Sequence, residues 1–177
     1  MNILINSIID KSEELNYFFK QFHGGNYVVY GDLILFDYEG DEKKINLQDI
    51  RIIYMRLSSE NSFDSVSKED AIEGEMILTD WTNAVEEIDK ALRYAPKDEG
   101  WQAAEDMSLD IVTDSEHENR KKTFWKIIQN NFELPPQYVY RLDSDYPSYF
   151  SMYVMWGFCY IILKDGKGLI LYAGASD

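Results

Sequence analysis

Two acidic residues in the last third of the chain are the first candidates for chemistry. The stretch LDSDYPSY contains Asp143 and Asp145, two carboxylates separated by one serine. Carboxylate oxygens spaced in this way can hold a divalent cation, so a small carboxylate- or metal-dependent enzyme is one alternative. The same short motif is common in solvated turns, and the Tyr-Pro that follows favours a turn here. We therefore expect no bound metal and no other cofactor.

Nucleophilic chemistry has few candidate residues. The chain contains one cysteine, Cys159, and two histidines, His23 and His117. A Cys–His pair would have to use Cys159, which lies in an apolar run where a thiol behaves as a small hydrophobic side chain. The ligand sets of zinc sites are missing, as are a Walker A loop, a dinucleotide-binding glycine motif and a nucleophile elbow. These observations predict that the protein is not an enzyme.

Acidic residues are concentrated in the middle of the chain. The formal net charge is −15, and residues 60–118 contain eighteen Asp and Glu against four Lys and Arg. Such a field repels nucleic acid and anionic membranes and attracts basic proteins, although it could also serve solubility alone. An exposed tryptophan among carboxylates would anchor an interface. The candidate partner-binding residues are Glu86, Glu87, Asp89, Asp98, Glu99, Trp101, Glu105, Asp106, Asp110, Asp114, Glu116 and Glu118.

Several helices are expected to position these residues. Apolar residues from Ile5 to Phe22 recur at near-helical spacing and predict a first helix. Residues 81–92 predict a second, with one apolar face and one acidic face. A third begins at a capping box formed by Ser115 and Glu118. Ser67, with Asp70 three residues further on, could cap another short helix.

Strands are expected before and between these helices. Residues 26–47 hold two apolar runs separated by Gly31-Asp32, and a third run, Ile50–Leu57, is rich in β-branched and aromatic residues. The three runs predict an antiparallel meander, although residues 47–51 could instead form a helical turn. The meander is similar to the first strands of a pleckstrin-like barrel, which leaves a ligand- or peptide-binding module as another alternative. Shorter strands are expected at residues 76–81 and 109–113.

The C-terminal segment is the most apolar part of the chain. Asp165-Gly166 lies between two apolar runs, which predicts a hairpin. The run before this turn does not alternate with polar residues, so both of its faces should be covered and the hairpin should lie in the centre of the sheet. Runs of strands and runs of helices indicate an α+β fold. We expect one domain over residues 1–177, with a mainly antiparallel sheet and three or so helices.

The cellular location follows from two further features. A lone cysteine fits a reducing compartment. No signal peptide and no segment long enough to span a bilayer are recognised. We therefore expect a cytoplasmic protein that binds neither membrane nor nucleic acid, while the oligomeric state stays open.

The chain resembles the small immunity proteins of bacterial polymorphic and contact-dependent toxin systems. The resemblance rests on its modest size, high aromatic content and strong acidity. It rests also on the ending WGFCYIILKDGKGLILYAGASD, which is similar to the apolar terminal hairpin of such proteins. The resemblance implies a non-enzymatic inhibitor of a basic toxin. The acidic residues named above would fill the toxin's cleft, and charge steering would make the association fast.

Overall fold

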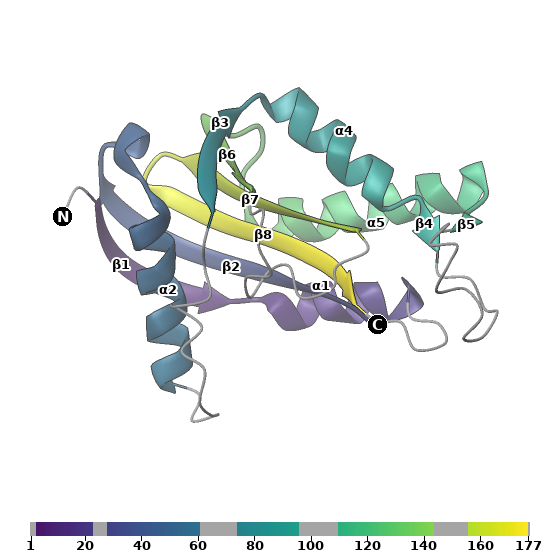
Figure 1. The fold of residues 1–177 in the computed structure, drawn as a ribbon, viewed down its shortest axis with the longest axis horizontal. Helices are drawn as coiled ribbons and strands as arrows, with labels where there is room; N and C mark the ends of the chain where they lie inside the picture. Colours follow the sequence, from purple (N-terminus) through teal and green to yellow (C-terminus); the bar gives the residue numbers. More distant parts are fainter. Residues whose placement is uncertain (1–2, 23–27, 61–73, 96–109, 144–155, 177) are drawn as a thin grey trace.

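An antiparallel sheet of six strands forms the centre of the computed structural model, in the order β1-β2-β8-β7-β6-β3 (Figure 1). The structure describes residues 3–22, 28–60, 74–95, 110–143 and 156–176. The strands of the sheet are β1 (Ile3–Asp10), β2 (Val28–Gly40), β3 (Glu75–Thr79), β6 (Tyr138–Asp143), β7 (Trp156–Lys164) and β8 (Lys167–Ser176). A separate two-stranded pair consists of β4 (Tyr94–Ala95) and β5 (Asp110–Ile111).

Helices pack on both faces of the sheet. They are α1 (Ser12–Phe19), α2 (Leu47–Glu60), α4 (Trp81–Ala91) and α5 (Asp114–Asn131), with short 3₁₀ turns η1 (Lys20–Phe22) and η2 (Glu42–Lys44). On one face, Phe19 of α1, Ile88 of α4 and Phe124 of α5 join a core with side chains of β2, β7 and β8. On the other face, Ile50 and Ile53 of α2 join a second core. No helix of the described part is long and apolar enough to cross a membrane.

The C-terminal hairpin is confirmed as the centre of the sheet. β7 and β8 pair with each other and lie between β6 and β2. Every residue from Phe158 to Leu163 is buried, as a strand covered on both faces requires. Asp165 and Gly166 form the turn with φ values of 50° and 76°, the left-handed conformations that tight hairpins favour. The predicted α+β fold with a mainly antiparallel sheet is likewise confirmed, with four α-helices among the described residues.

A strand occupies the first half of the expected N-terminal helix. The helix prediction for Ile5–Phe22 is wrong there, because β1 extends to Asp10 and α1 begins only at Ser12. Ile3 and Ile5 are buried while Leu4 between them is exposed, which is the two-residue period of a strand. Pairing of β1 with β2 therefore overrides the near-helical spacing of the isoleucines.

The expected third strand of the meander is a helix. The strand prediction for Ile50–Leu57 is wrong, because α2 covers this segment, and the pleckstrin-like meander is overturned with it. Asp49 accepts a hydrogen bond from the Asn46 N–H at 3.0 Å, and Asn46 accepts one from the Gln48 N–H at 2.9 Å. These bonds satisfy backbone donors at the helix start, as a capping box does. Ile50 and Tyr54, one helical turn apart, are both buried.

Gly31 lies inside a strand and not between two strands. The expected break at Gly31-Asp32 is wrong, because β2 runs through it for 13 residues. A Cβ at Gly31 would lie 2.4 Å from the backbone oxygen of Tyr172 on β8 and 3.0 Å from side chains of Leu15 and Phe19 on α1. Glycine at this position therefore lets α1 and β8 approach β2 closely.

The remaining elements largely agree with expectation. α4, α5, β3 and the two-residue β5 fall in the expected segments. The cap of α5 differs, because Thr113 and not Ser115 accepts the hydrogen bond, from the Glu116 N–H. The short helix that Ser67 and Asp70 could cap falls on residues outside the described ranges.

Candidate functional site

Half of the twelve predicted partner-binding residues lie on α4 and the first turns of α5. The fold brings these helices together, because Nε2 of His117 donates to the backbone oxygen of Asp89 at 2.6 Å. The Trp125 indole donates to Asp89 Oδ1 at 2.7 Å. The six residues on the two helices are Glu86, Glu87, Asp89, Asp114, Glu116 and Glu118. Five others lie outside the described residues, namely Asp98, Glu99, Trp101, Glu105 and Asp106, and of Asp110 only the backbone, in β5, is described.

The acidic residues of α5 are paired with basic residues of the same molecule. Arg120, which is only 3% exposed, lies 2.8 Å from Glu116. Lys121 lies 2.5 Å from Glu118, and its hydrogen bond lowers the pKa of the Glu118 carboxyl. The pairs are Glu116–Arg120, Glu118–Lys121 and Asp114–Arg93. These carboxylates therefore form ion pairs within the chain, where they stabilise α5 and its neighbours without a partner protein.

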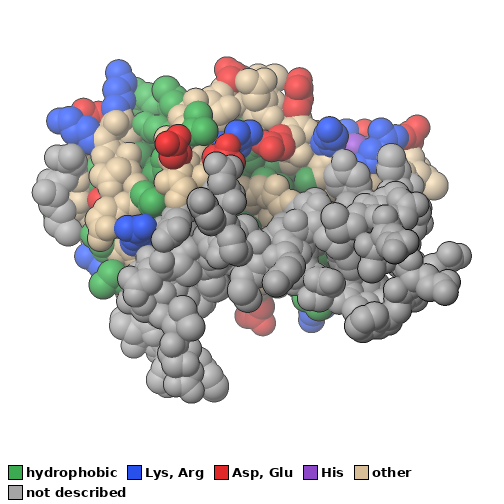
Figure 2. Space-filling model, viewed as in Figure 1, with side chains coloured by type: hydrophobic (Ala, Val, Ile, Leu, Met, Phe, Trp, Pro, Cys, Tyr) green, Lys and Arg blue, Asp and Glu red, His purple; other side chains and the backbone are tan. Residues whose placement is uncertain are grey.

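The described part of the α4–α5 face is balanced in charge. Residues 81–95 and 112–131 carry six acidic and six basic side chains. Figure 2 shows both signs interspersed along this side of the molecule. Charge steering of a basic partner requires a surface of one sign, and these two stretches do not form one.

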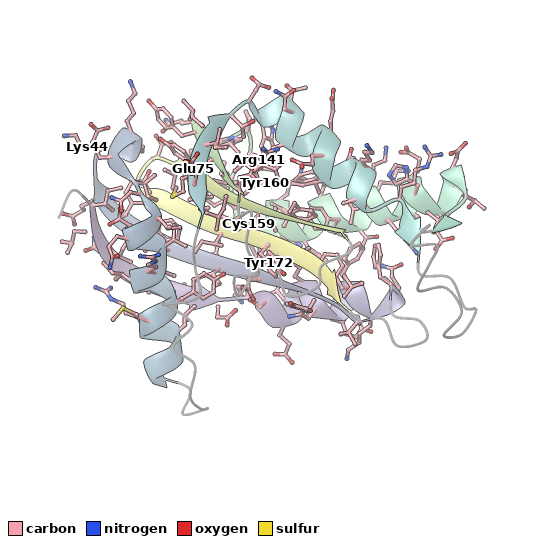
Figure 3. All side chains as sticks on the ribbon, in the orientation of Figure 1. Lys44, Glu75, Arg141, Cys159, Tyr160 and Tyr172 are labelled. Carbon is pink, nitrogen blue, oxygen red and sulfur yellow. The ribbon has the colours of Figure 1, made fainter. Side chains whose placement is uncertain are left out.

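Glu87 connects α4 to the sheet. Its carboxylate accepts a hydrogen bond from the hydroxyl of Tyr160 on β7, and Arg141 of β6 lies 3.9 Å away (Figure 3). Burial raises the pKa of the Tyr160 hydroxyl, and the Glu87 carboxylate raises it further. Glu87 thus holds the helix on the sheet.

The thiol of Cys159 is enclosed by the sheet and its second core. Cys159 is 6% exposed and lies opposite Tyr172 of β8 (Figure 3). Burial raises the pKa of the thiol, which disfavours the thiolate that acts as the nucleophile. The side chain behaves as the small hydrophobic residue that the sequence predicts.

Of the two candidate metal ligands, the structure describes only Asp143. Asp143 ends β6, and its carboxylate accepts a hydrogen bond from Arg141 at 2.9 Å. Asp145 lies outside the described residues. Within the described ranges, no three His, Cys, Asp or Glu side chains gather in a way that could hold a metal ion.

A different surface, outside the predicted partner-binding residues, lies at the β3 edge of the sheet. β3 is the last strand in the sheet order, and β6 is its one partner strand among the described residues. Ile77 is 40% exposed and Leu78 is 61% exposed. Figure 2 shows hydrophobic side chains reaching the surface in the upper left part of the view, where Figure 1 places β3. An apolar edge strand with no partner on its second side among the described residues is suited to pairing with another chain.

Carboxylates border these two apolar residues. Glu75 lies opposite Asp143 in the strand register. Asp80 directly follows β3 and caps α4 by accepting from the Thr82 N–H at 2.7 Å. Arg141 pairs with Asp143, whereas no described lysine or arginine forms an ion pair with Glu75 or Asp80. The β3 edge surface consists of Glu75, Ile77, Leu78, Asp80 and Asp143.

The sequence carries only an indirect signal for this surface. Met76, Ile77 and Leu78 are consecutive apolar residues, a pattern that predicts a strand covered on both faces. Met76 does pack against the second core, but Ile77 and Leu78 are exposed. These two apolar residues are accessible because the sheet order places β3 at an edge.

Comparison with known proteins identifies similar structures but no family. No family model and no curated protein sequence matches the chain. Two crystal structures of citrus MAF1 are similar, with 13% and 12% sequence identity and TM-scores of 0.47 and 0.48. Each match covers 93% of this chain and 98% of that chain. These values are too low to transfer an activity or a partner.

Proposed function

We propose that the chain is a non-enzymatic binding protein, an immunity or inhibitor protein that blocks a basic toxin in the cytoplasm. The observation that carries this proposal is the β3 edge surface, where two exposed apolar side chains lie between carboxylates. An apolar centre with a polar rim is the common anatomy of protein interfaces. The net charge of −15 favours a basic protein over nucleic acid or an anionic membrane.

The contact surface in this proposal differs from the acidic helices that the sequence suggested. Asp114, Glu116 and Glu118 already pair with basic residues of the chain, so they contribute little free charge. Glu75 and Asp80 do not have such partners among the described residues. A lysine or arginine of the toxin would therefore find unneutralised carboxylates beside an apolar anchor. The predicted residues between Asp98 and Asp106 remain candidates for further contacts.

Inhibition of this kind requires affinity and no turnover. A toxin that acts on nucleic acid needs a basic cleft, and a protein that covers part of the cleft excludes the substrate. Fast association would come from the charge difference between the two proteins, and slow dissociation from burial of the apolar residues.

The test uses the protein encoded directly upstream of this chain. We expect that its expression arrests growth, that this chain restores growth, and that the purified pair forms an equimolar complex. Raising the salt concentration should weaken that complex, because attraction between exposed charges is screened. An upstream product that neither arrests growth nor binds would contradict the proposal. So would a melting temperature that rises with Mg²⁺ or Mn²⁺ concentration, which would favour a metal-dependent enzyme.

A further inference from the structure

The two edges of the sheet differ in how open they are to another strand. β1, at one edge, has a register shift between Ile5 and Ser7, and the backbone oxygen of Ile5 accepts a hydrogen bond from Arg56 of α2 at 2.7 Å. Bulges and covered backbone groups are the usual means by which proteins close an edge. β3, at the other edge, pairs with β6 in an unbroken register from Glu75 to Thr79.

The side chains of β3 offer contacts on both faces of the sheet. Leu78 lies opposite Tyr140 and Ile77 lies opposite Arg141, and successive residues of a strand point to opposite faces. Tyr140 is 8% exposed, and its hydroxyl donates to the backbone oxygen of Glu42. A strand placed beside β3 could therefore pack one side chain against Leu78 on the α2 face and the next against Ile77 on the α4 face.

The charges at the two ends of β3 favour an added strand with basic residues at its own ends. Glu75 lies at the start of β3 and Asp80 lies just past its end, and neither forms an ion pair with a described lysine or arginine. A strand with lysine or arginine at both ends would meet opposite charges at both. A second copy of this chain would not supply these opposite charges. In an antiparallel pair centred on Ile77, each Glu75 would face Thr79 of the other copy. Both copies also carry a net charge of −15 and would repel each other.

We propose that the partner adds a β-strand to β3, and that this strand has an apolar, alternating centre and basic residues at its ends. This binding mode rests on the proposed function. It explains how an edge on which the structure describes two exposed apolar residues can bind a partner. Main-chain hydrogen bonds supply affinity in strand addition, and the alternate side chains supply specificity.

The experiment measures amide hydrogen exchange along β3 by nuclear magnetic resonance. The probe is a short peptide of alternating valine and threonine with two lysines at each end, and its matched control has glutamates in place of the lysines. The alternate β3 amides that point away from β6 should exchange freely in the unbound chain. Their exchange should slow roughly tenfold when nine-tenths of the protein molecules have the lysine peptide bound, because exchange then requires release of the peptide. The glutamate peptide should leave them unchanged.

Three results would overturn the strand-addition mode. The first is equal protection by both peptides, or by neither. The second is β3 protection that grows with protein concentration alone, which would assign the edge to a second copy. The third is full protection in the dilute unbound chain, which would mean that the chain itself already pairs with this edge. If β3 stays unprotected while the upstream protein still forms its equimolar complex, the mode fails and the proposed function stands. If that complex is also missing, both fail.

Discussion

Glu75 of β3 lies directly opposite Asp143 of β6 at the edge of the sheet. Like charges that face each other across two strands destabilise their pairing. Arg141 neutralises Asp143 at 2.9 Å, but Glu75 has no such partner among the described residues. A residue that costs stability where it stands is the kind expected at a binding surface.

Replacing this glutamate should therefore make the protein more stable. We expect Glu75→Lys to raise the free energy of unfolding by about 0.2–1 kcal/mol, because the like-charge pair becomes an ion pair. The control is Glu13→Lys, which removes an exposed carboxylate from the first turn of α1 and should lower stability slightly through the helix dipole. Urea denaturation of both variants provides the measurement. A Glu75→Lys variant less stable than the parent would refute this account of the edge.

The pairing of the predicted acidic residues leads to a second prediction. Glu116→Gln should lower stability by about 1–2 kcal/mol, because it weakens the partner of the buried Arg120 guanidinium,. Glu118→Gln removes a surface pair and should change stability much less. Because the pKa of Glu118 is lowered in the folded protein, its small contribution is present above the unfolded pKa and is lost as the pH falls through the folded pKa. Neither variant should weaken partner binding as strongly as a change on the β3 edge surface. Stronger loss of binding for Glu116→Gln and Glu118→Gln would restore the acidic-helix model.

Some elements of the fold can be predicted from the sequence and others cannot. The C-terminal hairpin was predictable because a continuous apolar run and an Asp-Gly turn are both local signals. The sequence does not predict α2, because β-branched residues in this segment favour a strand, while the one-turn spacing of Ile50 and Tyr54 is a weaker signal. The sequence does not predict strand β1 either, because its pairing with β2 depends on a distant segment.

The site was harder to predict than the fold. The sequence shows how many carboxylates the middle of the chain carries, but it does not show which of them pair with Arg93, Arg120 or Lys121. The exposure of Ile77 and Leu78 depends on the strand order, to which distant segments contribute. Local sequence contains neither kind of information.

Cys159 should be chemically inert in the folded protein. Its thiol is buried and its pKa is raised, so a thiol reagent at mildly alkaline pH should react slowly with the native chain and rapidly after denaturation. Colorimetric labelling with and without denaturant measures this difference. Fast native labelling would show that the second core opens readily and would reinstate the thiol as a candidate nucleophile.

Gly31 should be sensitive to the smallest side chain. Gly31→Ala would place a Cβ 2.4 Å from the Tyr172 backbone oxygen, so β2 and β8 must separate, and we expect a loss of about 1–3 kcal/mol. Val28→Ala, an exposed position on the same strand, is the matched control and should cost much less. Thermal unfolding of the two variants tests this. Equal losses would mean that the close approach is not maintained in solution.

The most direct test of the β3 edge surface compares two exposed leucines on the two sheet edges. Leu78 of β3 is 61% exposed and Leu4 of β1 is 49% exposed, so lysine at either position should leave the fold intact, which circular dichroism and the unfolding midpoint would verify. The affinity for the upstream protein is then measured by calorimetry. We predict that Leu78→Lys weakens binding at least about tenfold, or about 1.4 kcal/mol, whereas Leu4→Lys leaves it unchanged. Equal affinities for the two variants would contradict the assignment of β3 as the binding edge.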